Sequence, residues 1–475
     1  MADQPVQDSL LTLLIGQRRA FQSSAPLNHE GRVQALERLL SATLKHQDAL
    51  AEAVDADFGN RSAVETRLLE IFPLADEIRH IKRRLKRWMR PRRAAANWQF
   101  RPSRAKILYQ PLGVVGVIGA WNYPILLTLS PLANALAAGN HVMIKPSEAA
   151  PRTAEAIRVM IGEIFAENHV TVVTGGADVS QAFAALPFDH LIFTGSGRVG
   201  KMVMQAAAAN LTPVTLELGG KSPALVHESY SMPAAAERIC SAKLWNAGQT
   251  CVAPDYVLVP SHKIEEFIAE AARVMARRAP RLLSGDYTRM IDKRAWRRMR
   301  DLLDEAQAKG AQICQINPAQ ESLTEENRAF PPTLVTGVDD SMRLMQEEIF
   351  GPILPIVAYS SLGEALEAIN CRPRPLALYY FDADQQRIDQ VLSGTMSGGV
   401  TVNDCIFHFV QHSLPFGGVG ASGMGAYHGF TGFETFSKKR GVLRQSGLVA
   451  RALGLLRPPY GFWARRIVAL LIGGR

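Results

Sequence analysis

Cys251 is the residue of this sequence that is best placed to act as a nucleophile. It follows Gly248-Gln249-Thr250, a run that leaves room for another group to approach the sulfur, and the thiolate is the reactive form of cysteine. A buried and inert thiol is the alternative interpretation. We prefer that alternative for the other cysteines, which are Cys240, Cys314, Cys371 and Cys405.

Two further segments carry side chains that could assist such a nucleophile. Glu217 precedes Gly219-Gly220, which suits a carboxylate held in a cleft lined by backbone, although a surface turn is the alternative. Asn122 lies within Trp121-Asn122-Tyr123-Pro124 and has a side-chain amide that can donate hydrogen bonds. An aromatic turn is the alternative there.

A glycine-rich loop is typical of a phosphate-binding turn. Gly195-Ser196-Gly197-Arg198-Val199-Gly200 follows a predicted strand and precedes an alanine-rich helix. Glycines let the backbone approach a pyrophosphate, and a helix N-terminus attracts its charge. The usual dinucleotide pattern then has an acid about 20 residues further on for the adenosine ribose, a spacing that Glu217 satisfies.

The elements that must position these residues alternate in type. Residues 8–95 show helical periodicity, and from residue 112 short β-rich runs alternate with alanine-rich helical stretches, which predicts a parallel, doubly wound sheet. A second alternating region spans residues 222–415. We therefore expect an α/β protein, with a Rossmann-like cofactor domain packed against an α/β catalytic domain across a cleft.

Composition excludes several classes of protein. The chain has 475 residues, 47% apolar and 20% charged, as globular proteins do and disordered ones do not. Five scattered cysteines without a CxxC pair indicate reduced thiols and argue against disulfides or a cysteine zinc site. We see no signal peptide and no apolar run of the ~18–20 residues that a spanning helix needs, so we expect a cytoplasmic location.

His408 and His412 could share a helical face but lack an acidic ligand, and we predict no metal site.

The positive charge is concentrated at one end. The net charge is +9, and nine basic residues with no acidic one follow Glu434. The sequence before that tail is balanced in charge, which argues against a nucleic-acid-binding body.

Taken together, these segments resemble the aldehyde dehydrogenase superfamily over about residues 8–440. The matching segments are 121–124, 145–148, 193–200, 217–223, 248–251, Glu348-Ile349-Phe350-Gly351-Pro352 and Pro415-Phe416-Gly417-Gly418. Residues 57–60 and 423–429 resemble the class 3 branch, which contains fatty-aldehyde and coniferyl-aldehyde dehydrogenases. With residues 456–461, the chain is most similar to the coniferyl-type bacterial members.

The resemblance implies a mechanism. Cys251 would attack the aldehyde carbon to form a thiohemiacetal, and the Asn122 side chain and the Cys251 backbone N–H would stabilise its oxyanion. Losing one such donor typically costs ~3–4 kcal/mol. Hydride transfer to the nicotinamide would leave a thioester, and Glu217 would activate the water that hydrolyses it. Glu217 is then the catalytic base and not the ribose acid.

The resemblance also implies which residues bind the cofactor. Lys145 would direct its ammonium to the adenosine ribose, with Glu148 nearby. Because a carboxylate repels a 2′-phosphate, Glu148 favours NAD over NADP. Class 3 enzymes often accept both.

The remaining cofactor contacts would come from two loops. The turn that contains Gly195, Ser196 and Gly200 would accommodate the pyrophosphate together with the helix after it. Glu348 would hold the nicotinamide ribose, and Phe350 would pack beside the nicotinamide.

The substrate is expected to be a hydrophobic or aromatic aldehyde, either coniferyl aldehyde-like or a fatty aldehyde. Tyr123, Phe407 and His408 are candidates for the substrate tunnel, and each could equally belong to the core. One competing function is a CoA-acylating enzyme of the same superfamily, against which Glu217 argues because a thiol acceptor needs no hydrolytic base. A membrane-associated, non-catalytic relic of the fold is the other, and the intact Cys251 and Asn122 argue against it.

The resemblance divides the chain into four parts. Residues 1–92 and 112–217 form the NAD(P)-binding domain, residues 218–421 the catalytic domain, and residues 93–111 and 422–440 a small β bridging element for oligomerisation, typically of a homodimer. Residues 441–475 form a basic amphipathic tail. A helix over residues 461–473 would be ~20 Å long, too short for a ~30 Å bilayer core. It could lie on the inner face of an anionic membrane, cap the tunnel or pack on the partner subunit.

Overall fold

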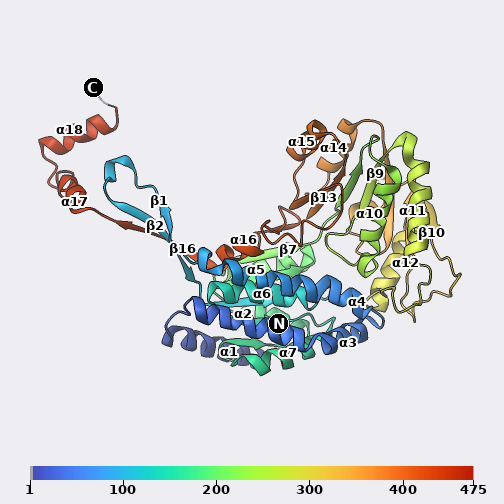
Figure 1. The fold of residues 1–475 in the computed structure, drawn as a ribbon, viewed down its shortest axis with the longest axis horizontal. Coiled ribbons are helices and arrows are strands. Elements are labelled where there is room, and N and C mark those ends of the chain that lie inside the picture. The colour runs from blue at the N-terminus through green and yellow to red at the C-terminus, as the bar shows by residue number, and fades with distance from the viewer. Residues whose placement is uncertain (1–3, 474–475) are drawn as a thin grey trace.

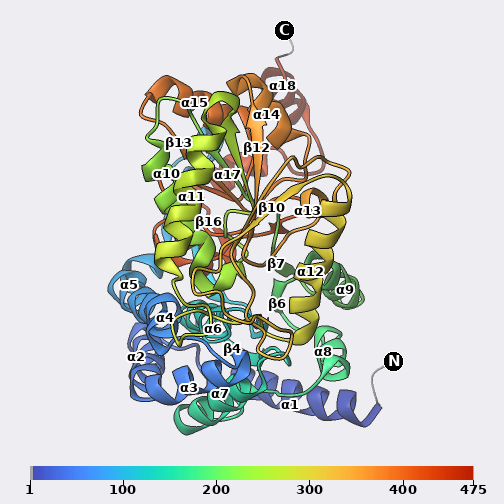
Figure 2. The same cartoon turned by 90° about the vertical axis from the view of Figure 1, so that its right-hand side faces the viewer.

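The alternating segments fold into two layered α/β halves and a projecting arm (Figure 1, Figure 2). The structure is a computed structural model that describes residues 4–473. The helices are α1 Gln4–Ser23, α2 His29–Lys45, α3 Gln47–Phe58, α4 Ala63–Thr66, α5 Phe72–Trp88, α6 Leu126–Ala138, α7 Pro151–Ile164, α8 Ala177–Ala184, α9 Gly197–Ala208, α10 Met232–Leu244, α11 Ile264–Arg278, α12 Lys293–Ala308, α13 Arg343–Gln346, α14 Leu362–Asn370, α15 Gln385–Gly394, α16 Gly429–Thr435, α17 Gly447–Gly454 and α18 Phe462–Leu471. The strands are β1 Arg92–Ala94, β2 Arg104–Pro111, β3 Val114–Ile118, β4 His141–Lys145, β5 Val170–Val172, β6 His190–Gly195, β7 Val214–Leu218, β8 Pro223–Val226, β9 Tyr256–Pro260, β10 Gln312–Gln315, β11 Thr333–Thr336, β12 Ile353–Tyr359, β13 Ala377–Phe381, β14 Gly399–Val402, β15 Gly423–Met424 and β16 Ser437–Arg444.

The first half is built on a six-stranded sheet in the order β15-β7-β6-β3-β4-β5, parallel except for the short β15. Its central strands are rich in valine and isoleucine because helices cover both faces. Along β3, Val115 and Val117 join the core on the side of α6, whereas Val114 and Ile118 join the core on the side of α1 and α8. The predicted Rossmann-like, doubly wound sheet is confirmed.

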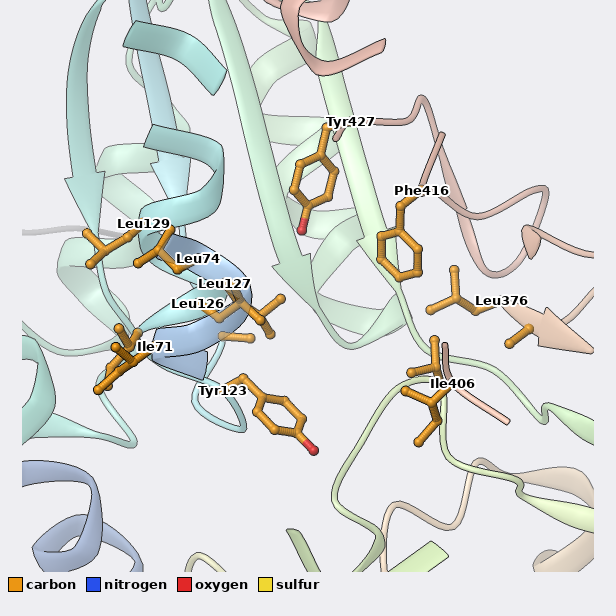
Figure 3. Close-up of a cluster of buried hydrophobic side chains, with 14 of the residues drawn as sticks. Ile71, Leu74, Tyr123, Leu126, Leu127, Leu129, Leu376, Ile406, Phe416 and Tyr427 are labelled. Atoms are coloured by element: carbon orange, nitrogen blue, oxygen red, sulfur yellow. The ribbon is translucent and has the colours of Figure 1, made fainter. Parts of the chain in front are cut away.

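Helix α6 is the centre of this half. All thirteen of its residues are buried, since it lies between the sheet and the outer helices α2 and α5 (Figure 1). Its leucines pack with Ile71 and Leu74 in the cluster drawn in Figure 3. A helix that is apolar all round is what such a position requires.

The second half contains a seven-stranded sheet in the order β10-β11-β12-β9-β8-β13-β14, in which only the edge strand β10 is antiparallel. Helices α10 and α11 cover one face, where they share a core with Val257 and Val259 of β9. Helices α14 and α15 cover the other face, packing with Leu258 of the same strand. The second α/β region expected from the sequence is therefore present.

The arm is a three-stranded antiparallel sheet, β1-β2-β16, that projects from the first half and carries α17 and α18 at its end (Figure 1). Strand β16 pairs with β2 over its whole length, from Ser437 opposite Pro111 to Arg444 opposite Arg104. Residues 8–95 were expected to be helical throughout, but the helices end at Trp88 and β1 begins at Arg92. Pro91 explains the change, since it disfavours a helical conformation in the preceding residue. Within residues 4–473, no helix has the length and apolarity needed to cross a membrane.

Candidate active site

A cavity of about 1370 Å³ lies where the two halves meet. Its floor includes Ile118, Gly195 and Leu218, which end β3, β6 and β7. The carboxyl ends of parallel strands are the usual place for a ligand in an open α/β sheet. Residues from the second half, among them Cys251 and Glu348, close the cavity from the opposite side.

The loop before Cys251 has an unusual backbone that only certain residues allow. Asn246 and Ala247 have φ values of 53° and 50°, and Gly248 has a φ of 74°. A Cβ at Gly248 would lie 2.3 Å from the carbonyl oxygen of Gly351, so no side chain fits there. Left-handed residues other than glycine are costly and gather at functional sites. The strained turn thus brings Cys251 to the cavity wall.

Asn122 is tied to the same loop. Its side-chain Nδ2 donates to the carbonyl of Gln249 at 3.1 Å, and its own carbonyl accepts from Nδ2 of Asn246 at 2.9 Å. Asn122 lines the cavity together with Cys251. The structure therefore brings the predicted oxyanion donor and the predicted nucleophile to one wall of one cavity.

Glu217 is a buried carboxyl group on the cavity wall. It lies near the end of β7, between Thr194 of β6 and Gly423 of β15, and its residue exposure is 1%. Among the described residues, neither of its carboxylate oxygens has a hydrogen-bond partner. Burial raises the pKa of Glu217 well above its ordinary value, because a carboxylate loses its hydration there. Such a group is a stronger base than an exposed glutamate.

The Cys251 thiol also resists ionisation. Burial raises the pKa of Cys251 well above its ordinary value, and the nearby carboxyls of Glu217 and Glu348 raise it further. A thiol in this state needs a proton acceptor when it attacks. Glu217, on the wall of the same cavity, is chemically suited to be that acceptor.

Gly219 makes room for Glu348. A Cβ at Gly219 would lie 2.0 Å from the Oε2 of Glu348, so the absence of a side chain at Gly219 leaves room for a second carboxyl group. Burial and the charge of Asp255 raise the pKa of Glu348 to about 8, against an opposing hydrogen bond from the Gly220 backbone. Sequence reasoning anticipated a backbone-lined cleft at this motif, but not that Glu348 would fill part of it.

Phe350 and the glycine-rich turn contribute apolar and backbone surface to the cavity. Phe350 has a φ of 54° and its ring lies 5.4 Å from that of Trp121. Ser196 lines the cavity and caps α9, with its hydroxyl accepting from the N–H of Val199 at 3.4 Å. Gly200 is not among the described lining residues; a Cβ there would lie 2.7 Å from Leu218, so its role is close packing of α9 on the sheet.

Glu148 lines the cavity, whereas Lys145, which was predicted to bind the cofactor, lies outside its described lining. Lys145 is buried, and its Nζ donates to the carbonyl of Pro146 at 2.8 Å and to Oε2 of Glu148 at 3.4 Å. Burial lowers the pKa of Lys145, and the charge of Glu148 opposes that shift.

Two groups of lining residues were not predicted from the sequence. Ser180 and Gln181 on α8 and Gln205 on α9 line the cavity from the first half, and Arg294 and Arg298 on α12 line it from the second half. Arg298 donates to the carbonyls of Ile349 at 2.6 Å and Glu348 at 2.5 Å. Only the spacing of the two arginines, four apart on one helix face, was visible in the sequence.

The tunnel candidates lie outside the described lining of this cavity. Tyr123 is buried, with its hydroxyl 2.6 Å from Oγ1 of Thr250. His408 is also buried and contacts Oγ1 of Thr401 through Nδ1 at 2.8 Å. Phe407 is 44% exposed and lies beside Trp245. Residues 403–414 form turns and bends, so His408 and His412 do not share a helical face, and His412 pairs with Asp76 at 2.9 Å instead.

The cavity fits a dinucleotide. It combines a glycine turn at the N-terminus of a twelve-residue helix, which suits a pyrophosphate, with the buried Oε1 of Glu348, which has no partner among the described residues and suits a ribose hydroxyl. Residues of α8 and α9 also line this cavity.

Comparison with known proteins agrees with this geometry. The model of the aldehyde dehydrogenase family matches residues 16–442. The chain belongs to the aldehyde dehydrogenase family. It is 50% identical to a probable coniferyl aldehyde dehydrogenase of Pseudomonas aeruginosa over 462 residues, which is 97% of this chain and 96% of that one. The resemblance found in the sequence is confirmed.

Solved structures of the family have the same fold. One described as the substrate-bound state of Staphylococcus aureus AldH has a TM-score of 0.90 at 37% identity, covering 97% of this chain and 99% of that one. A Mycobacterium tuberculosis aldehyde dehydrogenase complexed with NAD+ has a TM-score of 0.84 at 26% identity, covering 93% of this chain and 91% of that one. The protein is an NAD(P)-dependent aldehyde dehydrogenase, an oxidoreductase acting on aldehydes.

The buried carboxyl of Glu217, which has no partner among the described residues, should make the stability of the protein depend on pH. The pKa of Glu217 is higher in the folded protein than in the unfolded chain. At a pH below the pKa of the unfolded chain, this carboxyl does not lower the free energy of unfolding. As the pH rises from that value towards the pKa in the folded protein, the unfolded chain ionises first and the free energy of unfolding falls. Glutamine cannot ionise, so Glu217→Gln should raise the melting temperature over wild type, by more at pH 8 than at pH 5. Glu52→Gln, at an exposed position of α3, should show the same small difference at both pH values. An equal or smaller gain at pH 8 for Glu217→Gln would contradict the desolvated state of this carboxyl.

Proposed function

We propose that this aldehyde dehydrogenase oxidises a hydrophobic or aromatic aldehyde, of the coniferyl aldehyde-like or fatty class, to the free carboxylic acid. The observation that carries the proposal is the buried carboxyl of Glu217, without a partner among the described residues and on the wall of the cavity that also exposes Cys251. A buried base of this kind is needed to deprotonate water, and water is the acceptor that gives a free acid.

In the proposed first step, Cys251 forms a bond from Sγ to the aldehyde carbon and its thiol proton passes to Glu217. The negative charge that develops on the aldehyde oxygen is held by the Asn122 side chain and the Cys251 backbone N–H. The dinucleotide, when bound, supplies the acceptor for the hydride that leaves this carbon. Glu348 and Phe350 shape the part of the cavity next to Cys251 in which that group is held.

In the proposed second step, Glu217 takes a proton from a water molecule that attacks the thioester carbon. The C–S bond then breaks, the sulfur of Cys251 recovers a proton, and the acid leaves. Between the two steps Glu217 releases the thiol proton to solvent, so the same carboxyl accepts one proton in each step, for which its raised pKa is favourable. A CoA-acylating enzyme would need no such base, and a non-catalytic relic would have no reason to keep these residues in one cavity.

We assign the adenosine end of the cofactor to the part of the cavity next to Lys145 and Glu148, and the pyrophosphate to the turn at Gly195 and Ser196, with Gly200 holding the helix against the sheet. We infer a preference for NAD over NADP from Glu148, whose carboxylate faces the cavity and would repel a 2′-phosphate.

Substrate choice rests on the aromatic surroundings of the nucleophile loop. Tyr123 belongs to the apolar core that packs against Cys251, and Trp121 and Trp245 pack against the same core. The ring of Phe407 contacts that of Trp245. The similarity to a probable coniferyl aldehyde dehydrogenase favours an aryl or cinnamyl aldehyde. Long-chain aliphatic aldehydes are the second candidate class.

The direct test measures product and cofactor together. With coniferyl aldehyde and NAD but no CoA, wild-type enzyme should form one equivalent of free acid per NADH. Cys251→Ala should lose NADH formation by about a thousandfold or more, because no covalent intermediate can form, while its dissociation constant for NAD stays within about twofold. Cys405→Ala, a buried thiol outside the cavity lining, is the matched control. Turnover that requires CoA, or NADH formation by Cys251→Ala, would refute the proposal.

We further propose that the arm joins two subunits into a homodimer and that its tip contacts the inner face of an anionic membrane. Residues 79–111 contain twelve basic and no acidic side chains, and residues 435–475 contain nine basic and none acidic. These two segments meet in the β2–β16 pairing. Six of these basic residues lie on α5, outside the arm, so residues 89–111 and 435–475 together hold 15 basic and no acidic side chains, and the other residues hold 38 basic and 44 acidic ones. The charge balance that was inferred from the sequence therefore conceals a mildly acidic body and a basic arm.

The tip adds apolar side chains to this charge. Helices α17 and α18 carry apolar side chains that are each more than 60% exposed, namely Leu448, Phe462, Trp463 and Leu470. Arg465 and Arg466 lie on α18 among them. Exposed aromatic and basic residues on short helices suit the interface of a bilayer. The outer strand β16 offers a free edge to a second copy of the chain.

Vesicle sedimentation tests the membrane contact. The full chain should sediment with phosphatidylserine-containing vesicles at low salt and be released by raised salt, since screening weakens surface attraction. A chain ending at residue 444 should lose most of this binding while keeping its specific activity. Phe462→Ala with Trp463→Ala should weaken binding, and the matched surface change Met396→Ala, which lies outside the arm and tail, should not. Undiminished binding by the shortened chain would contradict the contact.

A further inference from the structure

Arg61 and Glu70 form a fully buried ion pair that the mechanism above does not use. Both side chains are 0% exposed, and Nη1 of Arg61 lies 3.1 Å from Oε1 of Glu70. Removing two charges from water is costly unless both are paired and hydrogen-bonded. The groups that hydrogen-bond to this pair therefore indicate which part of the structure it stabilises.

The pair hydrogen-bonds to both ends of the turn that contains Asn122. Nη1 of Arg61 also donates to the backbone carbonyl of Asn122 at 3.0 Å. Oε2 of Glu70 accepts from the backbone N–H of Ile125 at 2.8 Å and of Leu126 at 3.1 Å, where α6 begins. The carbonyl of one residue and two N–H groups a turn further on are thus fixed by one ion pair.

The pair also reaches the nucleophile loop through Tyr123. The Arg61 guanidinium lies 4.9 Å from the centre of the Tyr123 ring. The Tyr123 hydroxyl lies 2.6 Å from Oγ1 of Thr250, the residue before Cys251. Figure 3 shows this hydroxyl pointing away from the apolar cluster of Ile71, Leu126 and Leu127. Asn122 and Cys251 are therefore tied together on the side away from the cavity.

The local backbone is adapted to place these charges. Glu70 lies in a π-helical segment, η1 Arg67–Ile71, between α4 and α5. Such wide turns are rare and are frequent at functional sites. The backbone N–H of Arg61 is fixed by Oδ1 of Asp55 at 2.8 Å. Both members of the pair thus come from the helical layer outside the sheet.

We propose that Arg61 and Glu70 are positioning residues that aim the Asn122 amide at the oxyanion formed during attack by Cys251. The inference rests on the proposed role of Asn122 as oxyanion donor. A preorganised donor acts only when its N–H points at the place where charge develops, and small displacements cost much of its effect. The ion pair fixes the backbone of Asn122, and the Gln249 carbonyl fixes its side chain.

A double-mutant cycle with Asn122 tests the proposal in the full-length enzyme. The variant Arg61→Met/Glu70→Gln removes both charges, so that no single charge stays buried. With saturating NAD, its kcat/KM for the aldehyde should fall about tenfold or more, whereas its dissociation constant for NAD should stay within about twofold. In the Asn122→Ala background the same change should lower kcat/KM by less than about twofold, because the donor is already absent.

Arg32→Met is the matched control. Arg32 is buried in the same half and holds the opposite end of α6, donating from Nη1 to the carbonyl of Ala137 at 3.0 Å. Its replacement should lower the melting temperature and leave kcat/KM within about twofold. If the paired variant does not fold, Arg61→Lys provides a milder test, since lysine keeps the charge but lacks the planar fork of arginine. It should show a smaller fall with the same dependence on Asn122.

The outcomes separate the two proposals. An unchanged kcat/KM in the paired variant, or an equal fall with and without Asn122, would overturn the positioning role while leaving the proposed function intact. If Asn122→Ala itself kept full kcat/KM, the oxyanion donor of the proposed function would be wrong, and the positioning role would fall with it.

Discussion

Removal of water from Glu217 and Cys251 is the constraint on which the rest of the active site depends. A carboxyl and a thiol on the wall of one cavity keep raised pKa values only because the two halves close over them. The wall of the cavity also depends on two close contacts at glycines, where a Cβ at Gly219 would meet the side chain of Glu348 and a Cβ at Gly248 would meet the backbone of Gly351. Each glycine therefore marks a close contact that the buried chemistry imposes on the fold.

The charges around the cavity are arranged so that the reactive groups remain without strong partners. Arg61 is paired with Glu70, and Lys221 is paired with Asp255. Asp255 in turn accepts from the N–H of Ile349 at 2.9 Å, which fixes the loop between Glu348 and Phe350. These pairs stabilise the loops on either side of Cys251 without neutralising Glu217. Structural ion pairs thus lie near a carboxyl that has no partner among residues 4–473 and that we propose as the base.

Local sequence signals predicted the elements and motifs, but not every contact between them. The valine-rich run at β3 and the motifs around Cys251 and Glu217 were recognisable, because strand pattern and glycine spacing are local properties. The surface at Ser180 and Arg298 was not, since it depends on how helices from distant parts of the chain dock. The hydrogen bond from Arg61 to Asn122 could not be predicted either, because it joins residues 61 positions apart. Nor could the basic arm, which forms when β2 pairs with β16.

The most direct test of the central role given to Glu217 is the mass of the intact protein during turnover. Glu217→Gln, mixed with coniferyl aldehyde and excess NAD and quenched in acid, should carry one acyl group on Cys251, in an amount equal to the NADH of the first turnover. That turnover should be slower than in wild type, but the second step should be slowed more, because a thiol can lose its proton to solvent before it attacks, whereas water must be deprotonated as it attacks. Its steady-state rate should fall by about a hundredfold or more, and Glu52→Gln should carry no adduct. An unmodified Cys251 together with wild-type turnover in Glu217→Gln would contradict the account.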